Sequence, residues 1–277
     1  MSALAGARSE AASAKSFADA LTVAALGILA YMLDSVLHEG VGHGGACVLT
    51  GGHAIGLSSV YFECSAETRL VMAGGTLVNL IAGAVFFLFG RWTRREHAHW
   101  KYFCWLAMTI NLYAGTGYFL FSGIGGMGDW GEFIQGLGPQ WAWRIGLTLL
   151  GAVSYLLAAR ISLLELRALI GSGPERFQRG MRLSAIPYFA GGILMCLAGA
   201  LNPKGAILIL ISAAASTFGG SSGLLWATQW LRGGGFIPFG SKAEPLPITR
   251  SWRLVAASAV TAVVFVAVLG RGIQFVQ

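Results

Sequence analysis

Ionisable side chains gather in one short stretch of this chain, "DSVLHEGVGHGGACVLTGGH", residues 34–53. It holds three of the five histidines in the sequence. An apolar run leads into the stretch, and ionisable groups in such a run are costly and commonly functional. Four of them, Asp34, His38, Glu39 and His43, lie within ten residues. Imidazoles and carboxylates together are typical ligands of a zinc ion, and a neighbouring glutamate can act as a general base.

The spacing of the two central histidines decides how they can share an ion. His38 and His43 are five residues apart, whereas the zinc motif H-E-x-x-H places its histidines four apart on one helix face. On a straight α-helix the longer spacing turns the two side chains roughly 140° apart. A single π-turn absorbs one extra residue, and Gly40 and Gly42 lower its steric cost. The spacing therefore predicts a π-wound helix whose imidazoles face one point. The alternative is a polar helix end whose histidines bond to neighbouring side chains.

The composition predicts that this stretch lies in a membrane protein. Of the 277 residues, 55% are hydrophobic and 11% charged, against about 25% charged in soluble domains. The mean hydropathy is +0.66. Seven apolar runs approach the roughly 20 residues that cross a bilayer: residues 17–37, 70–90, 102–122, 141–159, 183–201, 206–231 and 254–270. The expected fold class is all-α, a polytopic bundle of about seven transmembrane helices.

The positive charges indicate how the bundle is oriented. Fifteen of the 19 Lys and Arg residues fall in four segments, residues 8–15, 91–101, 160–182 and 232–253. These segments are alternate loops between the expected spans, so the positive-inside rule places them and the N-terminus in the cytoplasm and the C-terminus outside. The net charge of +7 is thereby explained by topology and contact with anionic lipid, and not by a nucleic-acid partner.

The chain is expected to form one compact unit, because no internal repeat and no soluble domain stands between the spans. Residues 1–16 form a short cytoplasmic leader without a cleaved signal, residues 17–140 a core, and residues 141–277 additional helices. The glycine-rich segment 122–139 is expected to be a loop or re-entrant turn. Cys47 and Cys64 bracket the first outer loop. With that loop outside, in an oxidising compartment, a disulfide between them is one expectation, and two unpaired thiols are the alternative.

Two segments carry a resemblance to a known family. "LHEGVGHGGACVLTGGHAIGL" and "RLVMAGGTLVNLIAGAVFFL" resemble the site-2 proteases, intramembrane zinc metalloproteases, especially their short bacterial branch without a PDZ domain. In that family a first core helix bears the histidines, an extended segment follows, and a second helix has a glycine-rich pattern ending in asparagine. A third core helix ends in Gly-Asp, matched here by "GMGDW". The chain departs from the pattern in its histidine spacing, in Gly75 near the family's proline, and in the shortened sequence around the aspartate.

The resemblance implies a three-helix core in a bacterial inner membrane and a role for each matched residue. His38, His43 and Asp129 would bind Zn²⁺, with Glu132 as a reserve ligand, and Glu39 would act as general base and acid. Asn79 would hydrogen-bond the extended substrate backbone, or serve in packing between helices.

Asp34, one turn before His38, is expected to accept the second N–H of that ring, or to face water or another helix.

Three functions remain open at this point. An intramembrane metallopeptidase would cut a membrane protein or peptide near the outer side of the membrane. A non-catalytic, metal-stabilised scaffold or complex subunit would keep the fold and the ion. A metal or proton transporter would use the same buried groups, although neither paired broken helices nor an inverted repeat is visible.

Overall fold

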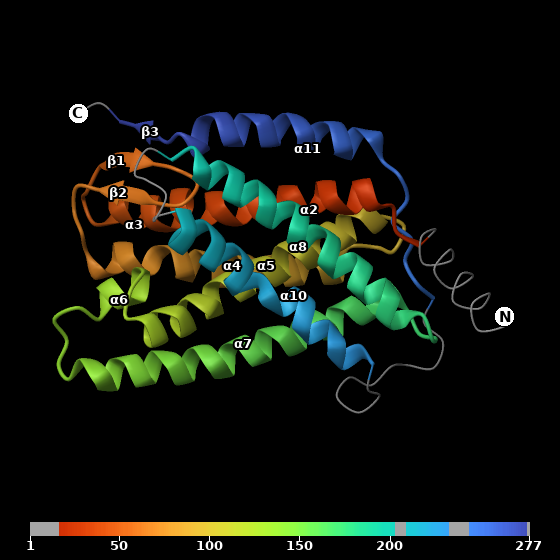
Figure 1. Cartoon of the computed structure of the whole chain (residues 1–277), viewed down its shortest axis with the longest axis horizontal. Coiled ribbons are helices and arrows are strands. Elements are labelled where there is room, and N and C mark those ends of the chain that lie inside the picture. The colour runs from red at the N-terminus through yellow and green to blue at the C-terminus, as the bar shows by residue number, and fades with distance from the viewer. Residues whose placement is uncertain (1–16, 203–208, 233–243, 276–277) are drawn as a thin grey trace.

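The structure is a computed structural model that describes residues 17–202, 209–232 and 244–275. The expected leader, residues 1–16, lies outside the described residues. The described part is a mostly helical bundle with one small sheet at one end (Figure 1). The expected all-α bundle is thus observed at the level of the helices, and the sheet is an addition to it.

The helices of the first half are α2 (Ala20–Ser35), η1 (Val36–His43), α3 (Gly44–Leu49), α4 (Arg69–Trp92), α5 (Ala98–Gly125) and α6 (Asp129–Phe133). Those of the second half are α7 (Gln140–Ile170), α8 (Arg176–Ala200), η2 (Ile209–Gly219), η3 (Gly220–Ser222), α10 (Gly223–Trp226), η4 (Ala227–Leu231), α11 (Trp252–Phe265) and η5 (Val266–Gly270). Side-chain oxygens start two of them, because Asp19 accepts the backbone N–H of Thr22 and Thr68 that of Val71.

Five helical segments are long and apolar enough to cross a membrane: Ala20–Leu49, Arg69–Trp92, Gln140–Ile170, Arg176–Ala200 and Trp252–Gly270. They overlap five of the seven expected spans and identify the chain as an integral membrane protein. The third expected span falls in α5, which has 28 residues. The sixth begins outside the described residues and continues from Ile209 as short π, 3-10 and α segments. The count of seven spans stays a prediction.

Helix α5 is the central element of the bundle, with α4 and α7 packed along it (Figure 1). Its Tyr102 hydroxyl donates to the carbonyl oxygen of Leu183 in α8 at 2.6 Å, and its Trp105 ring N–H donates to Ser162 in α7 at 2.9 Å. Such bonds satisfy polar tips that the membrane interior could not solvate. They hold α5, the longest helix of the first half, against α7 and α8 of the second half.

Helices α2 and α8 approach closely where small residues face larger ones. A Cβ on Gly27 would overlap Pro187, and one on Gly191 would overlap the ring of Tyr31. Small residues at such points allow helix backbones to approach in a membrane. The contact places α8 over the helix that continues into the histidine motif.

The sheet has three short antiparallel strands in the order β2-β1-β3: β1 (Ala54–Leu57), β2 (Phe62–Cys64) and β3 (Ile273–Gln274). The turn between β1 and β2 is held from two sides. Ser35 of α2 donates its hydroxyl to the carbonyl oxygen of Ser59 at 2.9 Å, and the Ser59 N–H donates to Leu269 O at 2.8 Å. This turn therefore lies directly beside the end of α2.

Candidate metal centre

The two histidines of the motif face each other because the helix that carries them is π-wound. Helix η1 covers Val36–His43, and the N–H of Gly44 donates to the carbonyl oxygen of Glu39, five residues earlier. The π-turn predicted from the spacing is confirmed. His38 and His43 are both buried, and their rings meet at 77° with centroids 4.8 Å apart.

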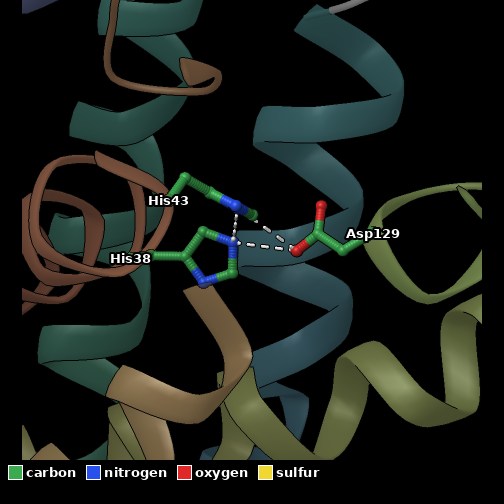
Figure 2. Close-up of side chains that lie close together, drawn as sticks. All are labelled: His38, His43 and Asp129. Atoms are coloured by element: carbon green, nitrogen blue, oxygen red, sulfur yellow. Dashed lines mark hydrogen bonds and ion pairs between the residues drawn. The ribbon is translucent and has the colours of Figure 1, made fainter. Parts of the chain in front are cut away.

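A carboxylate completes a triangle with the two rings (Figure 2). Asp129 Oδ2 lies 3.1 Å from His38 Nε2 and 3.5 Å from His43 Nε2, and the two Nε2 atoms are 3.2 Å apart. In a tetrahedral site with zinc–ligand distances of about 2.0–2.1 Å, neighbouring ligand atoms lie about 3.3–3.4 Å apart. Burial raises the pKa of the Asp129 carboxyl, but its contacts with both rings outweigh burial and hold that pKa below its usual range. The three atoms are therefore spaced as zinc ligands and include one anion.

The outer nitrogens of the rings show which atoms offer lone pairs to the centre. His43 Nδ1 lies 2.7 Å from the carbonyl oxygen of Val71, which can only accept, so this nitrogen carries a proton. His38 Nδ1 lies 2.8 Å from Asn79 Oδ1, also an acceptor. In neutral rings both Nε2 atoms then hold lone pairs directed at each other and at Asp129. A shared metal ion, or a second proton on one of the rings, supplies the positive charge that three converging acceptors need.

The aspartate reaches the histidines through a short helix anchored on α4. Gly126 and Gly128, with φ of 68° and 76°, turn the chain between α5 and α6 in a region that favours glycine. Trp130, the residue after Asp129, donates its ring N–H to the hydroxyl of Thr76 at 3.0 Å. The carboxylate is thus positioned by contacts of its own helix.

One face of α4 serves as the template of the site. Val71, Gly75 and Asn79 follow one another at intervals of four residues and therefore lie on the same side of the helix. Val71 orients His43 with its backbone oxygen, and Asn79 orients His38 with its amide. Gly75 lies between them.

Glycine at the middle position keeps the centre open. A Cβ on Gly75 would lie 2.5 Å from His38 Nε2 and 2.6 Å from His43 Nε2, which is the side where an ion would be held. A Cβ on Gly42 of η1 would lie 2.5 Å from Gly75 Cα, and one on Gly74 would overlap the backbone of Gly42. The two helices therefore meet backbone to backbone, and no side chain intrudes on the ligand triangle.

A small cavity lies on another side of His38. It measures about 40 Å³, and Asp34, His38 and Glu39 line one wall. The opposite walls come from α5, α8, η2 and η3, with hydroxyl-bearing residues among them: Tyr118, Ser216, Thr217 and Ser221. A space of this size with polar walls can hold water. Among the described residues, the buried Glu39 carboxylate has no hydrogen-bond or ion-pair partner, so it is free to act on such water.

The structure distinguishes the alternatives expected for two residues. Asn79 is fully buried, and its amide bonds to His38, Asp34 and Asn111, so both of its polar ends are used between helices and not on a substrate. Asp34 bonds to the amide nitrogen of Asn79 in another helix and not directly to the ring of His38. The sequence could place Asp34 one turn before His38 but could not show that Asn79 lay between them.

The remaining expected residues are divided between the site and its surroundings. Cys47 and Cys64 form a disulfide, which links α3 to β2 just beyond the histidines. The reserve ligand, Glu132, is exposed and does not join the group formed by His38, His43 and Asp129.

Sequence reasoning missed three contributors to the site. Val71 acts through its backbone, which no side-chain pattern reveals. Asn111 is one of the few amides in an apolar span, a signal that was available. Tyr118 stacks on His38 with ring centroids 4.7 Å apart and planes 21° apart, and an aromatic residue in a helix gives no sign of such a partner.

The fold and the site together define an integral membrane helix bundle with a group of two buried histidines and one half-buried aspartate that could hold a metal ion. No family model, no curated protein and no solved structure matches this chain.

Proposed function

We propose that this chain is an intramembrane zinc metallopeptidase of the site-2 protease type, which hydrolyses a peptide bond in a membrane protein or peptide. The single observation that carries the proposal is the triangle of His38 Nε2, His43 Nε2 and Asp129 Oδ2 beside the buried Glu39, which has no hydrogen-bond partner in the described part of the chain. Two imidazoles and one carboxylate are a common donor set for catalytic zinc, which keeps a fourth position open.

The residues divide the chemistry of hydrolysis among them. Zinc bound to this donor set would lower the pKa of water towards about 7 and polarise the scissile carbonyl. Glu39 would take a proton from water as the water oxygen adds to the scissile carbonyl carbon, and would deliver that proton to the leaving amine as the C–N bond breaks. Tyr118 stacks on the ring of His38 and, with Asn79, holds it in place. Burial of the whole group strengthens each electrostatic contact.

A second function is favoured by the size of the cavity. About 40 Å³ admits water but not a peptide in extended form, so a substrate would enter only if α8 or η2 moved away from α2 and α5. A non-catalytic subunit that uses the ion to fasten η1, α4 and α6 together needs no such movement.

Glutamine at position 39 separates the two functions. We expect Glu39→Gln to retain zinc and to cleave about 10²- to 10⁴-fold more slowly, because the amide cannot accept the proton of water. The assay reconstitutes the protein in liposomes with a panel of single-span apolar peptides and detects fragments by mass spectrometry. Glu96→Gln, the same change at an exposed carboxylate in the loop between α4 and α5, is the control and should cleave as the wild type does. Zinc-loaded wild-type protein that cleaves no peptide, or Glu39→Gln at full rate, would favour the scaffold.

The orientation of the site follows from the charge pattern and is part of the proposal. Single cysteines at the exposed positions Glu67 and Glu96, in a background without Cys104 and Cys196, place one probe on each expected side. In intact cells, an impermeant thiol reagent should label Glu67→Cys and leave Glu96→Cys unlabelled until the membrane is opened. The disulfide supports this orientation, because such bonds persist in oxidising compartments. The reverse labelling would place the site towards the cytoplasm.

A further inference from the structure

A chain of hydrogen bonds leads away from the metal centre, starting at the outer nitrogen of His38. His38 Nδ1 lies 2.8 Å from Asn79 Oδ1. The amide nitrogen of Asn79 donates to Asp34 Oδ1 at 2.5 Å and to Asn111 Oδ1 at 3.3 Å. The amide nitrogen of Asn111 donates to the carbonyl oxygen of Ala107, one turn earlier in α5, at 2.8 Å. Three helices, α2, α4 and α5, thus contribute one residue each to an arrangement behind a single ring.

The last hydrogen bond of this series determines which way each amide is turned. The Ala107 carbonyl can only accept, so the nitrogen of the Asn111 amide must face it and the oxygen must face Asn79. The Asp34 carboxylate also only accepts. Asn79 is therefore held with its nitrogen towards two acceptors and its oxygen towards His38. That oxygen requires a proton on His38 Nδ1, which leaves the Nε2 lone pair for the metal.

We propose that Asp34 and Asn111 are positioning residues for the metal, acting only through Asn79 to hold His38 in its metal-binding tautomer. A carboxylate that bonds directly to a ligand histidine is a common arrangement around zinc. Here the Asn79 amide lies between the Asp34 carboxylate and the His38 ring, and the Asn111 amide accepts a second hydrogen bond from Asn79. The proposal rests on the metal site of the proposed function but not on peptide hydrolysis.

The second ligand histidine shows why this arrangement matters at His38. His43 Nδ1 faces the main-chain oxygen of Val71, which is a hydrogen-bond acceptor whatever side chain stands at position 71. The partner of His38 is a side-chain amide, whose oxygen and nitrogen are nearly equal in shape. Turning Asn79 over would present N–H groups to Nδ1, draw the proton to Nε2 and remove the lone pair from the site. Asp34 and Asn111 prevent this turn.

A double-mutant cycle tests whether Asp34 acts through Asn79. The dissociation constants of Zn²⁺ and Co²⁺ are measured on the purified protein in detergent by competition with a chelator. We expect Asp34→Leu and Asn79→Leu each to weaken binding about 10- to 100-fold, as for other residues that orient a ligand. The double variant should bind as weakly as Asn79→Leu alone, because Asp34 has nothing left to orient. Asp34→Asn should keep most of the affinity, since its amide oxygen can still accept.

Control variants separate the arrangement from general damage to the core. Thr109→Val removes a buried hydroxyl of α5, two residues from Asn111, that has no hydrogen-bond partner among the described residues, and it should leave the affinity unchanged. Asn111→Leu should weaken binding. If a leucine variant fails to fold, Asp34→Ala removes the same acceptor with a smaller side chain. Loss of affinity in Asp34→Ala supports the proposal, and wild-type affinity overturns it.

Each outcome of the double-mutant cycle either supports or overturns the positioning role of Asp34. Wild-type affinity in Asp34→Leu, or losses that add in the double variant, overturn the proposal, because Asp34 would then be idle or act on the metal by another route. Wild-type protein that binds neither ion rejects the metal site and the positioning role together. If the cycle behaves as expected while no peptide is cleaved, the positioning role stands and the proposed peptidase function falls.

Discussion

Replacing Asp129 by alanine is expected to abolish stoichiometric zinc binding while the protein stays folded. The substitution removes the only anion among the three ligand atoms and leaves two neutral imidazoles, which hold zinc poorly. We expect a larger loss than the about 10- to 100-fold typical of residues that merely orient a ligand. Metal analysis of the purified variant, with dissociation constants measured against a chelator, gives the size of the effect.

The folding control for Asp129→Ala comes from the way α6 is anchored. Trp130 remains bonded to Thr76, and Ile134 of the same segment is buried against Phe119 and Leu147, so α6 should keep its place. The variant should therefore elute as the wild type does in size-exclusion chromatography. If the variant keeps one zinc per chain at wild-type affinity, Asp129 is not a ligand, and the non-catalytic scaffold becomes the favoured function.

A methyl group at position 75 is expected to be as damaging to metal binding as the loss of a ligand. In Gly75→Ala the new Cβ lies within 2.6 Å of both Nε2 atoms, in the space that an ion and its ligands share. Real Cβ atoms do not approach other atoms so closely, and both rings are fixed from behind by Val71 and Asn79. We therefore expect zinc content to fall to background. The same analysis of purified protein measures it.

Two glycine variants show whether the effect of Gly75→Ala belongs to the centre or to helix packing. Gly45→Ala adds a Cβ that meets nothing within 4 Å and should retain zinc and stability. Gly74→Ala presses against the backbone of Gly42 and should lower the midpoint of thermal unfolding of the metal-free protein. If Gly75→Ala lowers that midpoint as much as Gly74→Ala does and still binds zinc, the open space between the rings is not an ion site.

The convergence of His38 and His43 could be predicted from the sequence, because the angle between residues on a helix is a local property. Five residues cannot bring two rings together in an α-helix, and a π-turn was the simplest local solution. Asp129 could be named by resemblance to a family pattern. Its distance to the rings depends on the bond between Trp130 and Thr76, which joins residues 54 positions apart.

The surroundings of His38 could not be predicted, because they depend on how α2, α4 and α5 are rotated about their axes. Asp34 could be placed one turn before His38, but nothing local to either segment indicated that Asn79 would lie between them. The expected sixth span is a further case. In its "STFGGSSG" segment, residues 216–223, the helix changes between π, 3-10 and α winding. Its apolar composition did not determine which winding it adopts.

Because η1 is π-wound, the number of residues between two side chains does not by itself fix the angle between them about the helix axis, which is their phase. Deleting Gly40 would restore the four-residue spacing of H-E-x-x-H and remove the π-turn, so the residues after it would keep nearly the same angle about the helix axis. Cys47 would still face Cys64, and Gly42 would still face Gly74 and Gly75. The extra residue thus changes the count between the histidines and not their phase, and metal helices of this kind are better described by phase than by a fixed count of residues.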